Sequence, residues 1–412
     1  MILFSRLLRS IVMQGTLRVI DAAGRVHVFA GTPGPKVTIR LHDAKLEREL
    51  FFNPRLRLGE AYMDGRLTVE DGSIFDFLDF MAANMAAAPP SVMSPLYNGF
   101  GHAFRVFQQF NPLSRARANV AHHYDLSRTL YDLFLDSDRQ YSCAYFTAPD
   151  QSLDTAQAQK KRHIAAKLLL QPGQRVLDIG CGWGGLALSL AKECDVEVTG
   201  LTLSTEQLEL ARHRAAAAGL ADRVHFELLD YRQATGTYDR IYSVGMFEHV
   251  GVVHYAEFFR KMKELLSEDG VALLHSIGRW DGPAATNPWL RRYIFPGGYS
   301  PAMSEVLPVV ERTGLFITDI EVLRMHYAHT LKAWRERFDA NRERVRALYD
   351  ERFCRMWEFY LAGSEIAFRH QGHFVFQMQL ARKIDAVPLT RDYITDWERS
   401  HVPPMAADRA VA

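Results

Sequence analysis

The chain has 412 residues, of which 48% are apolar and 24% are charged, and its formal net charge is +1. This length suits two domains rather than one, and the apolar share excludes a disordered, collagenous or coiled-coil protein. The balanced charge argues against a nucleic-acid-binding protein, which would carry a strongly basic face.

The four cysteines are scattered along the chain and form no C-x-x-C pair. They therefore indicate neither a disulfide framework nor a thiolate metal site, and a cytoplasmic location is expected. The sequence has no apolar run of the roughly 18 residues that a spanning helix needs, so no transmembrane segment is expected.

The first fourteen residues have two interpretations. Apolar residues recur there at helical spacing, with Arg6 and Arg9 between them. Such a segment is either a short helix that caps a domain core or a basic amphipathic helix that rests on an anionic membrane surface. We favour the first interpretation, because two arginines contribute little attraction to a membrane.

The segment that follows predicts a small α+β domain over residues 1–83, joined by a linker over residues 84–118. The linker is expected because this stretch is rich in Ala, Pro, Ser and Asn. The Thr-Pro-Gly-Pro run at residues 32–35 is expected to end the second strand of the domain. Strands are predicted at residues 16–20, 25–30 and 37–41, and helices near residues 46–52 and 73–81.

The second domain, residues 119–395, shows a different pattern from residue 171 onward. Strand-like apolar runs alternate there with helical stretches, which is typical of an α/β fold with a doubly wound parallel sheet. The clearest helices are predicted at residues 205–218 and 255–266. Strands are predicted at residues 175–179, 197–201, 223–228, 240–244, 271–277, 315–321 and 374–380.

A long helical stretch from residue 330 to about residue 361 precedes the last predicted strand. An insertion between the last two strands would lie over the carboxyl edge of the sheet, where ligands bind in this architecture. We therefore expect a helical lid over about residues 328–370.

The clearest local signal is the run Val-Leu-Asp-Ile-Gly-Cys-Gly-Trp-Gly-Gly at residues 176–185, where a strand leads into closely spaced glycines and a helix. A dinucleotide site would need an acid at the end of the next strand, but residues 200–204 contain none. The carboxylate of Asp178 instead suits S-adenosylmethionine, which carries an ammonium and a sulfonium. Thr202, Ser204 and Gln207 can supply neutral hydrogen bonds, and the alternative is a packing turn without a ligand.

Several further motifs carry a resemblance to a known family. They are residues 141–146 (YSCAYF), 245–251 (GMFEHVG) and 273–278 (LLHSIG), together with residues 58–65 (LGEAYMDG), 289–298 (WLRRYIFPGG) and 330–338 (TLKAWRERF). With the glycine run they resemble the cyclopropane-fatty-acyl-phospholipid synthase family of S-adenosylmethionine-dependent methyltransferases, to which mycolic acid cyclopropane synthases are close relatives. The resemblance extends from about residue 40 to residue 383 and implies the doubly wound methyltransferase sheet.

The resemblance also implies the residues of the site. In such enzymes a methyl group adds to a cis double bond of an acyl chain, and a bound bicarbonate takes the proton whose loss closes the ring. Bicarbonate would be held by the side chains of Glu248, His275 and Tyr327 and by the backbone at Cys143 and Ile277. The cofactor would be bound by Tyr141, Ser142, Val176, Asp178, Gly180, Gly182, Gly184, Thr202, Leu203, Ser204, Gln207, Tyr231 and Arg232.

Unsaturated phospholipid acyl chains, a membrane surface and a second copy of the chain are the partners that the resemblance implies, with a peripheral location at the inner membrane face. Aromatic faces can stabilise the carbocation, and the candidates otherwise pack in the core. They are Tyr145, Phe146, Phe247, Tyr293, Phe295 and Tyr360.

Single motifs of this kind are more often structural, and the joint placement of Glu248 and His275 at one sheet edge is what favours catalysis. We interpret the two His-x-x-His pairs, at residues 326–329 and 370–373, as structural because no third metal ligand accompanies them.

Ser364 stands where many members have a cysteine, so either that cysteine is dispensable, which we favour, or the reaction differs. The alternatives are a fatty-acyl C-methyltransferase that gives a methyl-branched, methylene or furan-type product, and a non-catalytic lipid carrier.

Overall fold

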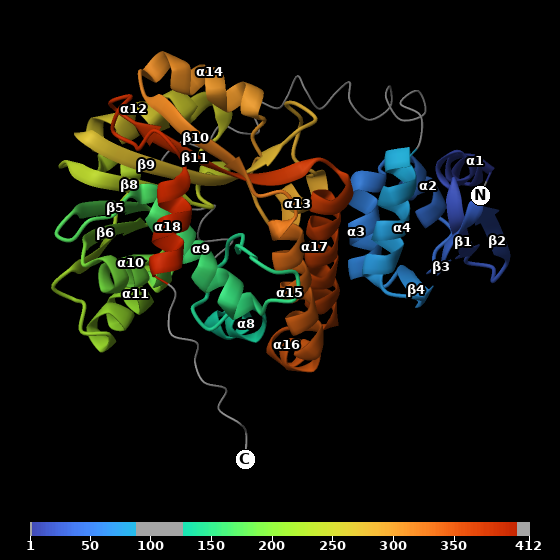
Figure 1. The fold of residues 1–412 in the computed structure, drawn as a ribbon. Coiled ribbons are helices and arrows are strands. Elements are labelled where there is room, and N and C mark those ends of the chain that lie inside the picture. Colours follow the sequence, from blue (N-terminus) through green and yellow to red (C-terminus); the bar gives the residue numbers. More distant parts are fainter. Residues whose placement is uncertain (1, 88–126, 402–412) are drawn as a thin grey trace.

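The computed structural model describes residues 2–87 and 127–401, which build two β-sheets with their covering helices (Figure 1). The smaller sheet has four strands in the order β2-β1-β3-β4, and the larger has seven in the order β10-β11-β9-β8-β5-β6-β7. The large sheet with its helices is the doubly wound α/β architecture that the sequence predicts.

The amino-terminal domain packs one face of its sheet against helices. Phe4 and Leu8 of α1 are buried together with the inward residues of β1 and β3, so this helix caps the domain core as predicted. The elements are α1 (Ile2–Ile11), β1 (Gln14–Ile20), β2 (Val26–Ala30), β3 (Thr32–Leu41), α2 (Leu46–Phe52), α3 (Pro54–Met63), β4 (Leu67–Asp71) and α4 (Ile74–Ala87).

Two features of this domain differ from the sequence prediction. Residues 32–35 do not end the second strand; they begin β3, which pairs in parallel with β1 after a register shift between Gln14 and Thr16. The shift accommodates Pro33 and Pro35, which have no N–H to donate to a ladder. In addition, α4 continues to Ala87, so residues 84–87 of the predicted linker are helical, and residues 88–118 lie outside the described residues.

All seven strands predicted for the second domain are present, within a few residues of their predicted ends. The domain consists of α8 (Arg128–Phe134), α9 (Leu153–Leu168), β5 (Arg175–Ile179), α10 (Gly185–Cys194), β6 (Glu197–Thr202), α11 (Thr205–Ala217), β7 (Val224–Leu228), η1 (Tyr231–Gln233), β8 (Tyr238–Val244), η2 (Phe247–His249), η3 (Val252–His254), α12 (Tyr255–Leu265), β9 (Leu266–Arg279), α13 (Pro288–Tyr293), α14 (Met303–Thr313), β10 (Phe316–Val322), α15 (His326–Ala340), α16 (Arg342–Leu348), α17 (Glu351–His370), β11 (His373–Ala381) and α18 (Asp392–Ser400).

Apolar side chains cover both faces of the large sheet. Helices α9, α10 and α11 pack on one face, and α12 and α14 pack on the other. The sheet is parallel except at its last strand in sequence, because β11 is antiparallel to both β9 and β10. The insertion α15–α17 starts and ends at the carboxyl edge of the sheet, so the returning strand must run in the opposite direction.

The predicted helical stretch consists of three helices. Helices α15 and α17 pack against each other and against α8 around a buried aromatic cluster that includes Trp334 and Trp357. On its other side α17 packs against α3 and α4, so this insertion lies between the large sheet and the amino-terminal domain (Figure 1). We call α15–α17 the insertion helices.

A glycine lies at a close contact between the two domains. Gly59 of α3 lies against the indole of Trp289 in α13, where a Cβ would come within 2.5 Å of the ring nitrogen. Trp289 is 1% exposed, and its Nε1–H donates to the Sδ of Met63 at 3.1 Å. The indole also contacts Phe359 of α17 edge-on, so α3, α13 and α17 meet at this residue.

Gly59→Ala should destabilise the protein even though alanine favours helices. The added methyl must displace a fully packed indole, which costs about 1–3 kcal/mol and exceeds the helix gain of about 0.5–1 kcal/mol. Gly363→Ala in α17 is the matched control, because a Cβ there meets no atom within 4 Å. Thermal unfolding should show a lower Tm for the first variant and an equal or higher Tm for the second. Equal shifts in both variants would contradict this packing.

Candidate active site

A cavity opens at the carboxyl ends of β5, β6 and β8, where ligands bind in this architecture. Ten of the thirteen residues predicted to bind a cofactor line it. These are Tyr141, Ser142, Asp178, Gly180, Gly182, Thr202, Leu203, Gln207, Tyr231 and Arg232.

The other three predicted residues support the cavity without lining it. Val176 is buried in the core beneath it. Gly184 begins α10 with a φ of 78°, and Ser204 caps α11 by accepting a hydrogen bond from the backbone N–H of Gln207.

The glycine run forms the floor of the cavity. The backbone N–H groups of Gly180 and Cys181 donate to the carbonyl of Leu201 at 3.0 and 2.8 Å, which ties the turn to the end of β6. Gly180 and Gly182 both have positive φ, a conformation that glycine adopts without strain. A Cβ on Gly182 would meet no protein atom within 4 Å, whereas one on Gly180 would touch Met246. A ligand can therefore approach the backbone closely at Gly182.

Asp178 is the acid that the sequence assigns to a cationic cofactor. Its side chain is 2% exposed, lines the cavity, and accepts a hydrogen bond from the hydroxyl of Tyr242 at 2.9 Å. Burial raises the pKa of Asp178 to about 7. A cation bound in the cavity would favour the charged form of this carboxyl group, so the environment suits a positively charged ligand.

Other lining residues escaped the sequence analysis. Asp230 follows β7, caps η1, and forms a bidentate ion pair with Arg232. His249 is half-buried, and desolvation lowers the pKa of its ring to about 4, so it lines the cavity as a neutral imidazole. The sequence signal that could have identified Asp230 is its place directly after β7. Glu248 was singled out from the sequence, and its neighbour His249 was given no role.

Glu248 lies on the short η2 helix that follows β8. Its Oε1 accepts a hydrogen bond from the backbone N–H of Ile277 at 2.7 Å. Its Oε2 is buried and has no hydrogen-bond partner among the described residues. Burial raises the pKa of Glu248 to about 7, so this carboxyl group can gain or lose a proton near neutral pH. The structure thus joins Glu248 to one of the two predicted backbone positions.

His275 lies two residues before Ile277 on β9 and is 2% exposed. The side-chain amide of Gln377 on β11 donates to its Nδ1 at 3.2 Å, and burial holds the pKa of the ring well below its usual value. A neutral imidazole that accepts at Nδ1 carries its proton on Nε2. His275 is therefore a hydrogen-bond donor through Nε2.

Tyr327 and Cys143 belong to the apolar cluster at the insertion helices, against which Ile277 also packs. Tyr327 lies in the first turn of α15, with its ring against Trp334 and Phe368. Cys143 is 1% exposed, and burial raises the pKa of its thiol, so the backbone role expected from the resemblance needs no thiolate.

The aromatic candidates divide into two groups. The hydroxyl groups of Tyr141 and Tyr360 lie 2.7 Å apart, and Phe295 contacts the ring of Tyr360 edge-on. Phe247 instead stacks on Tyr255 in the core beneath α12. Tyr293 donates its hydroxyl to Glu60 of the amino-terminal domain. Tyr360 thus contacts a predicted cofactor residue directly, and Phe295 packs against Tyr360.

Ser364 and the two His-x-x-His pairs are the remaining positions that the sequence singles out. Ser364 is half-buried on α17, one turn beyond Tyr360. Within residues 2–87 and 127–401 no group of three or more His, Cys, Asp or Glu side chains is arranged to hold a metal ion, and both His-x-x-His pairs have other contacts. His326 accepts from the backbone N–H of Phe146, and His370 pairs with Asp79.

The profile of the mycolic acid cyclopropane synthetase family matches residues 112–378. A relative from Pseudomonas putida, a probable fatty acid methyltransferase, is 38% identical over 344 residues, which are 82% of this chain and 84% of that protein. The cyclopropane-fatty-acyl-phospholipid synthase of Escherichia coli is 36% identical over 351 residues, which are 84% of this chain and 88% of that protein.

A solved structure is similar in fold and sequence. The mycolic acid cyclopropane synthase CmaA1, complexed with SAH and CTAB, is 34% identical and superimposes with a TM-score of 0.62. The match covers 66% of this chain and 99% of CmaA1.

Proposed function

Because this chain belongs to the mycolic acid cyclopropane synthetase family, we propose that it converts the cis double bond of an unsaturated phospholipid acyl chain into a cyclopropane ring. Membership makes it an S-adenosylmethionine-dependent methyltransferase and removes the lipid-carrier alternative. The observation that carries the proposal is the buried carboxyl group of Glu248, which has one oxygen fixed by Ile277 and the other without a partner among the described residues.

The side chains that the family resemblance groups with Glu248 are chemically suited to hold bicarbonate. The partnerless Oε2 of Glu248 can accept a hydroxyl proton, and Nε2–H of His275 and the hydroxyl of Tyr327 can donate to an anionic oxygen. S-adenosylmethionine supplies an electrophilic methyl group to the alkene, and bicarbonate, when bound, supplies the base that takes a proton from the alkylated chain. Glu248, His275 and Tyr327 would hold that base, and the backbone at Cys143 and Ile277 would complete its surroundings.

The surroundings of this donor set also exclude water. Cys143, Ile277 and Tyr327 are packed with the aromatic side chains of α8, α15 and α17. A carbocation formed beside such a cluster is shielded from water, which would otherwise add to it. Tyr360, whose hydroxyl pairs with that of Tyr141, can present an aromatic face to the cation.

The second candidate is fatty-acyl C-methylation that ends in a methyl-branched, methylene or furan-type product. The Pseudomonas putida relative, a probable fatty acid methyltransferase, favours it. Both reactions share the carbocation, and only the fate of its proton or hydride differs.

Product analysis separates the two candidates. The purified protein is incubated with S-adenosylmethionine that is fully deuterated in its methyl group and with vesicles of unsaturated phospholipid. We expect a product that keeps two of the three deuterium atoms and has lost its double bond, as mass spectrometry after ozonolysis would show. Retention of all three deuterium atoms, or of a double bond, would overturn cyclopropanation in favour of methylation.

A peripheral location at the inner membrane face and a homodimer stay predictions. In the described parts of the chain, no helix combines the length and the apolar character that crossing a membrane requires.

Cofactor affinity should rise with pH and then level off above about pH 7. In the free protein Asp178 is protonated below its pKa of about 7. A cationic cofactor favours the carboxylate, so binding at lower pH must release a proton, and this weakens the apparent affinity by up to about tenfold per pH unit. Calorimetric titration of S-adenosylmethionine from about pH 5 to about pH 8 should show this slope. The Asp178→Asn variant should bind S-adenosylmethionine weakly at every pH, and its affinity should not change with pH. If the pH dependence is the same as in the wild type, it must arise from another group.

A further inference from the structure

Helix α9 holds the segment of residues 140–142 through two buried polar side chains. Lys160 donates from Nζ to the Oε1 of Gln140 at 2.6 Å and to the Oγ of Ser142 at 2.8 Å. One turn earlier, the amide of Gln157 donates to the backbone carbonyls of Gln140 and Ser142 at 3.2 and 3.0 Å. Four hydrogen bonds from one helix face thus fix a stretch of three residues.

Lys160 is 0% exposed, which is costly for an ammonium group. Its surroundings offset this cost only in part, because burial still lowers the pKa of Lys160 to about 8 against the opposing effect of Asp136 and Asp138. A methionine would fill the same space without that penalty. The retention of a charge here therefore calls for a role beyond packing.

The segment that Lys160 holds is part of the cofactor cavity. Gln140, Tyr141 and Ser142 all line it. Tyr141 also pairs with Tyr360 of α17, so the same segment connects the cavity to the insertion helices. We propose that Lys160 is a positioning residue, which fixes residues 140–142 in the conformation that binds the cofactor. The proposal rests on cofactor use and is independent of which lipid product forms.

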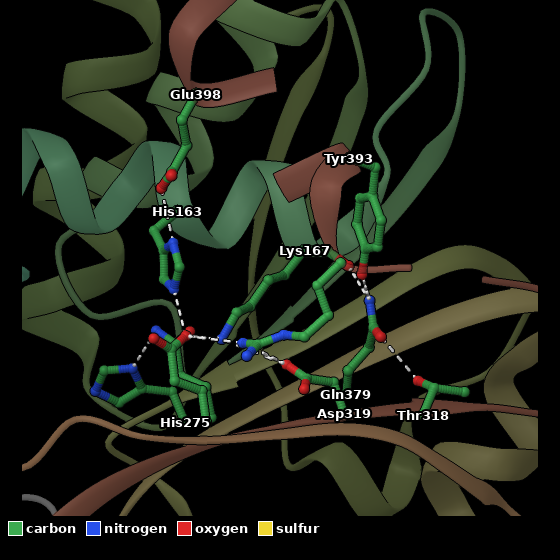
Figure 2. Close-up of polar contacts among 11 residues, drawn as sticks. His163, Lys167, His275, Thr318, Asp319, Gln379, Tyr393 and Glu398 are labelled. Carbon is green, nitrogen blue, oxygen red and sulfur yellow. Dashed lines mark hydrogen bonds and ion pairs between the residues drawn. The ribbon is translucent and has the colours of Figure 1, made fainter. Parts of the chain in front are cut away.

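A second buried lysine on the same helix provides a matched control. Lys167 is also 0% exposed and lies seven residues further along α9. It pairs with Glu321 of β10, which also contacts His163, and His163 in turn pairs with Glu398 of α18. Figure 2 shows Lys167, His163 and Glu398 together with Asp319 in this network, which ties α9 to β10 and α18. No residue of the network lines the cofactor cavity.

The test compares Lys160→Met with Lys167→Met in the full-length protein. Calorimetric titration with S-adenosylhomocysteine should give a Kd about tenfold higher for Lys160→Met and an unchanged Kd for Lys167→Met, whatever each variant loses in Tm. In turnover assays the KM for S-adenosylmethionine should rise with that Kd, whereas the KM for the lipid should not change. A wild-type Kd in folded Lys160→Met, or equal losses of affinity in the two lysine variants, would overturn the proposal.

Gln157→Leu keeps the proposal testable if Lys160→Met does not fold. The Oε1 of Gln157 has no partner among the described residues, so leucine replaces a side chain that is only half satisfied. This variant removes both hydrogen bonds to the carbonyls of residues 140 and 142 and should raise the same Kd severalfold. An unchanged Kd in folded Gln157→Leu would contradict a positioning role for this helix face. The probe needs no acyl substrate, so failure here is distinguishable from failure of the proposed cyclopropanation.

Discussion

Glu248→Gln should lower kcat by about a thousandfold, within the range that loss of a residue serving general-base catalysis produces. Glutamine keeps the shape of the side chain and can still accept the hydrogen bond from Ile277. It cannot take up a proton, and its amide group has only one oxygen to accept hydrogen bonds. Steady-state assays should therefore show the loss in kcat, while the Kd for S-adenosylhomocysteine stays unchanged.

Glu365→Gln is the control for this substitution. Glu365 is another buried glutamate, but both of its oxygens are paired, with Arg335 and Arg369. Its replacement should lower Tm and leave kcat within severalfold of the wild type. Wild-type turnover in Glu248→Gln, or an equal loss of kcat in both variants, would remove Glu248 from the chemistry.

Gly184→Ala should be among the most destabilising single substitutions in the methyltransferase domain, with a cost of about 3 kcal/mol. Its φ of 78° is unfavourable for alanine, and the new Cβ would lie 2.6 Å from the ring of Phe226 and 3.1 Å from Ala211. Both neighbours are buried and cannot move aside cheaply. Thermal or denaturant unfolding measures this loss.

Gly182→Ala, two residues earlier, should behave in the opposite way. Its Cβ meets no protein atom, so the stability loss is limited to the backbone cost of about 1 kcal/mol. The methyl group would instead occupy the cavity, and the Kd for S-adenosylhomocysteine should rise about tenfold, an effect of about 1.4 kcal/mol. Wild-type affinity in this variant would show that the cofactor does not approach the glycine run.

The sequence predicted the strands of the large sheet well because each is a short apolar run between helical stretches. Strand direction has no such signal, since the alternation of side chains is the same in both directions, and the antiparallel direction of β11 was therefore not predicted. Helix α3 and strand β4 were missed because both are short and partly exposed. Their stability comes from packing against α13 and β3, which no local pattern records.

The residues of the candidate site also fall into two groups, those that a local sequence motif reveals and those whose role depends on distant partners. Residues carried by a motif, such as Asp178 and Gly182, could be placed at the cavity because strand, turn and helix follow one another directly in the sequence. Lys160 could not, because its partners lie 18 and 20 residues away and a lysine on a helix usually indicates a solvated face. His275 was identified by resemblance, but its proton on Nε2 depends on Gln377, which is 102 residues away and belongs to the antiparallel strand.

The position of β11 between β10 and β9 also constrains how the protein is made. Strands β9 and β10 are not neighbours. Until β11 is inserted between them, β9 has one unpaired edge and β10 has no partner strand among the described residues. During synthesis from the amino terminus these edges must wait for the roughly fifty residues of the insertion, at translation rates of about 5–20 residues per second. For several seconds a nascent chain thus exposes unpaired edges of both strands, which can pair wrongly. The imidazole of His275 acquires its hydrogen bond from Gln377 only when the last strand arrives, so a ribosome-bound chain that ends before β11 lacks the contact that fixes the tautomer of this ring.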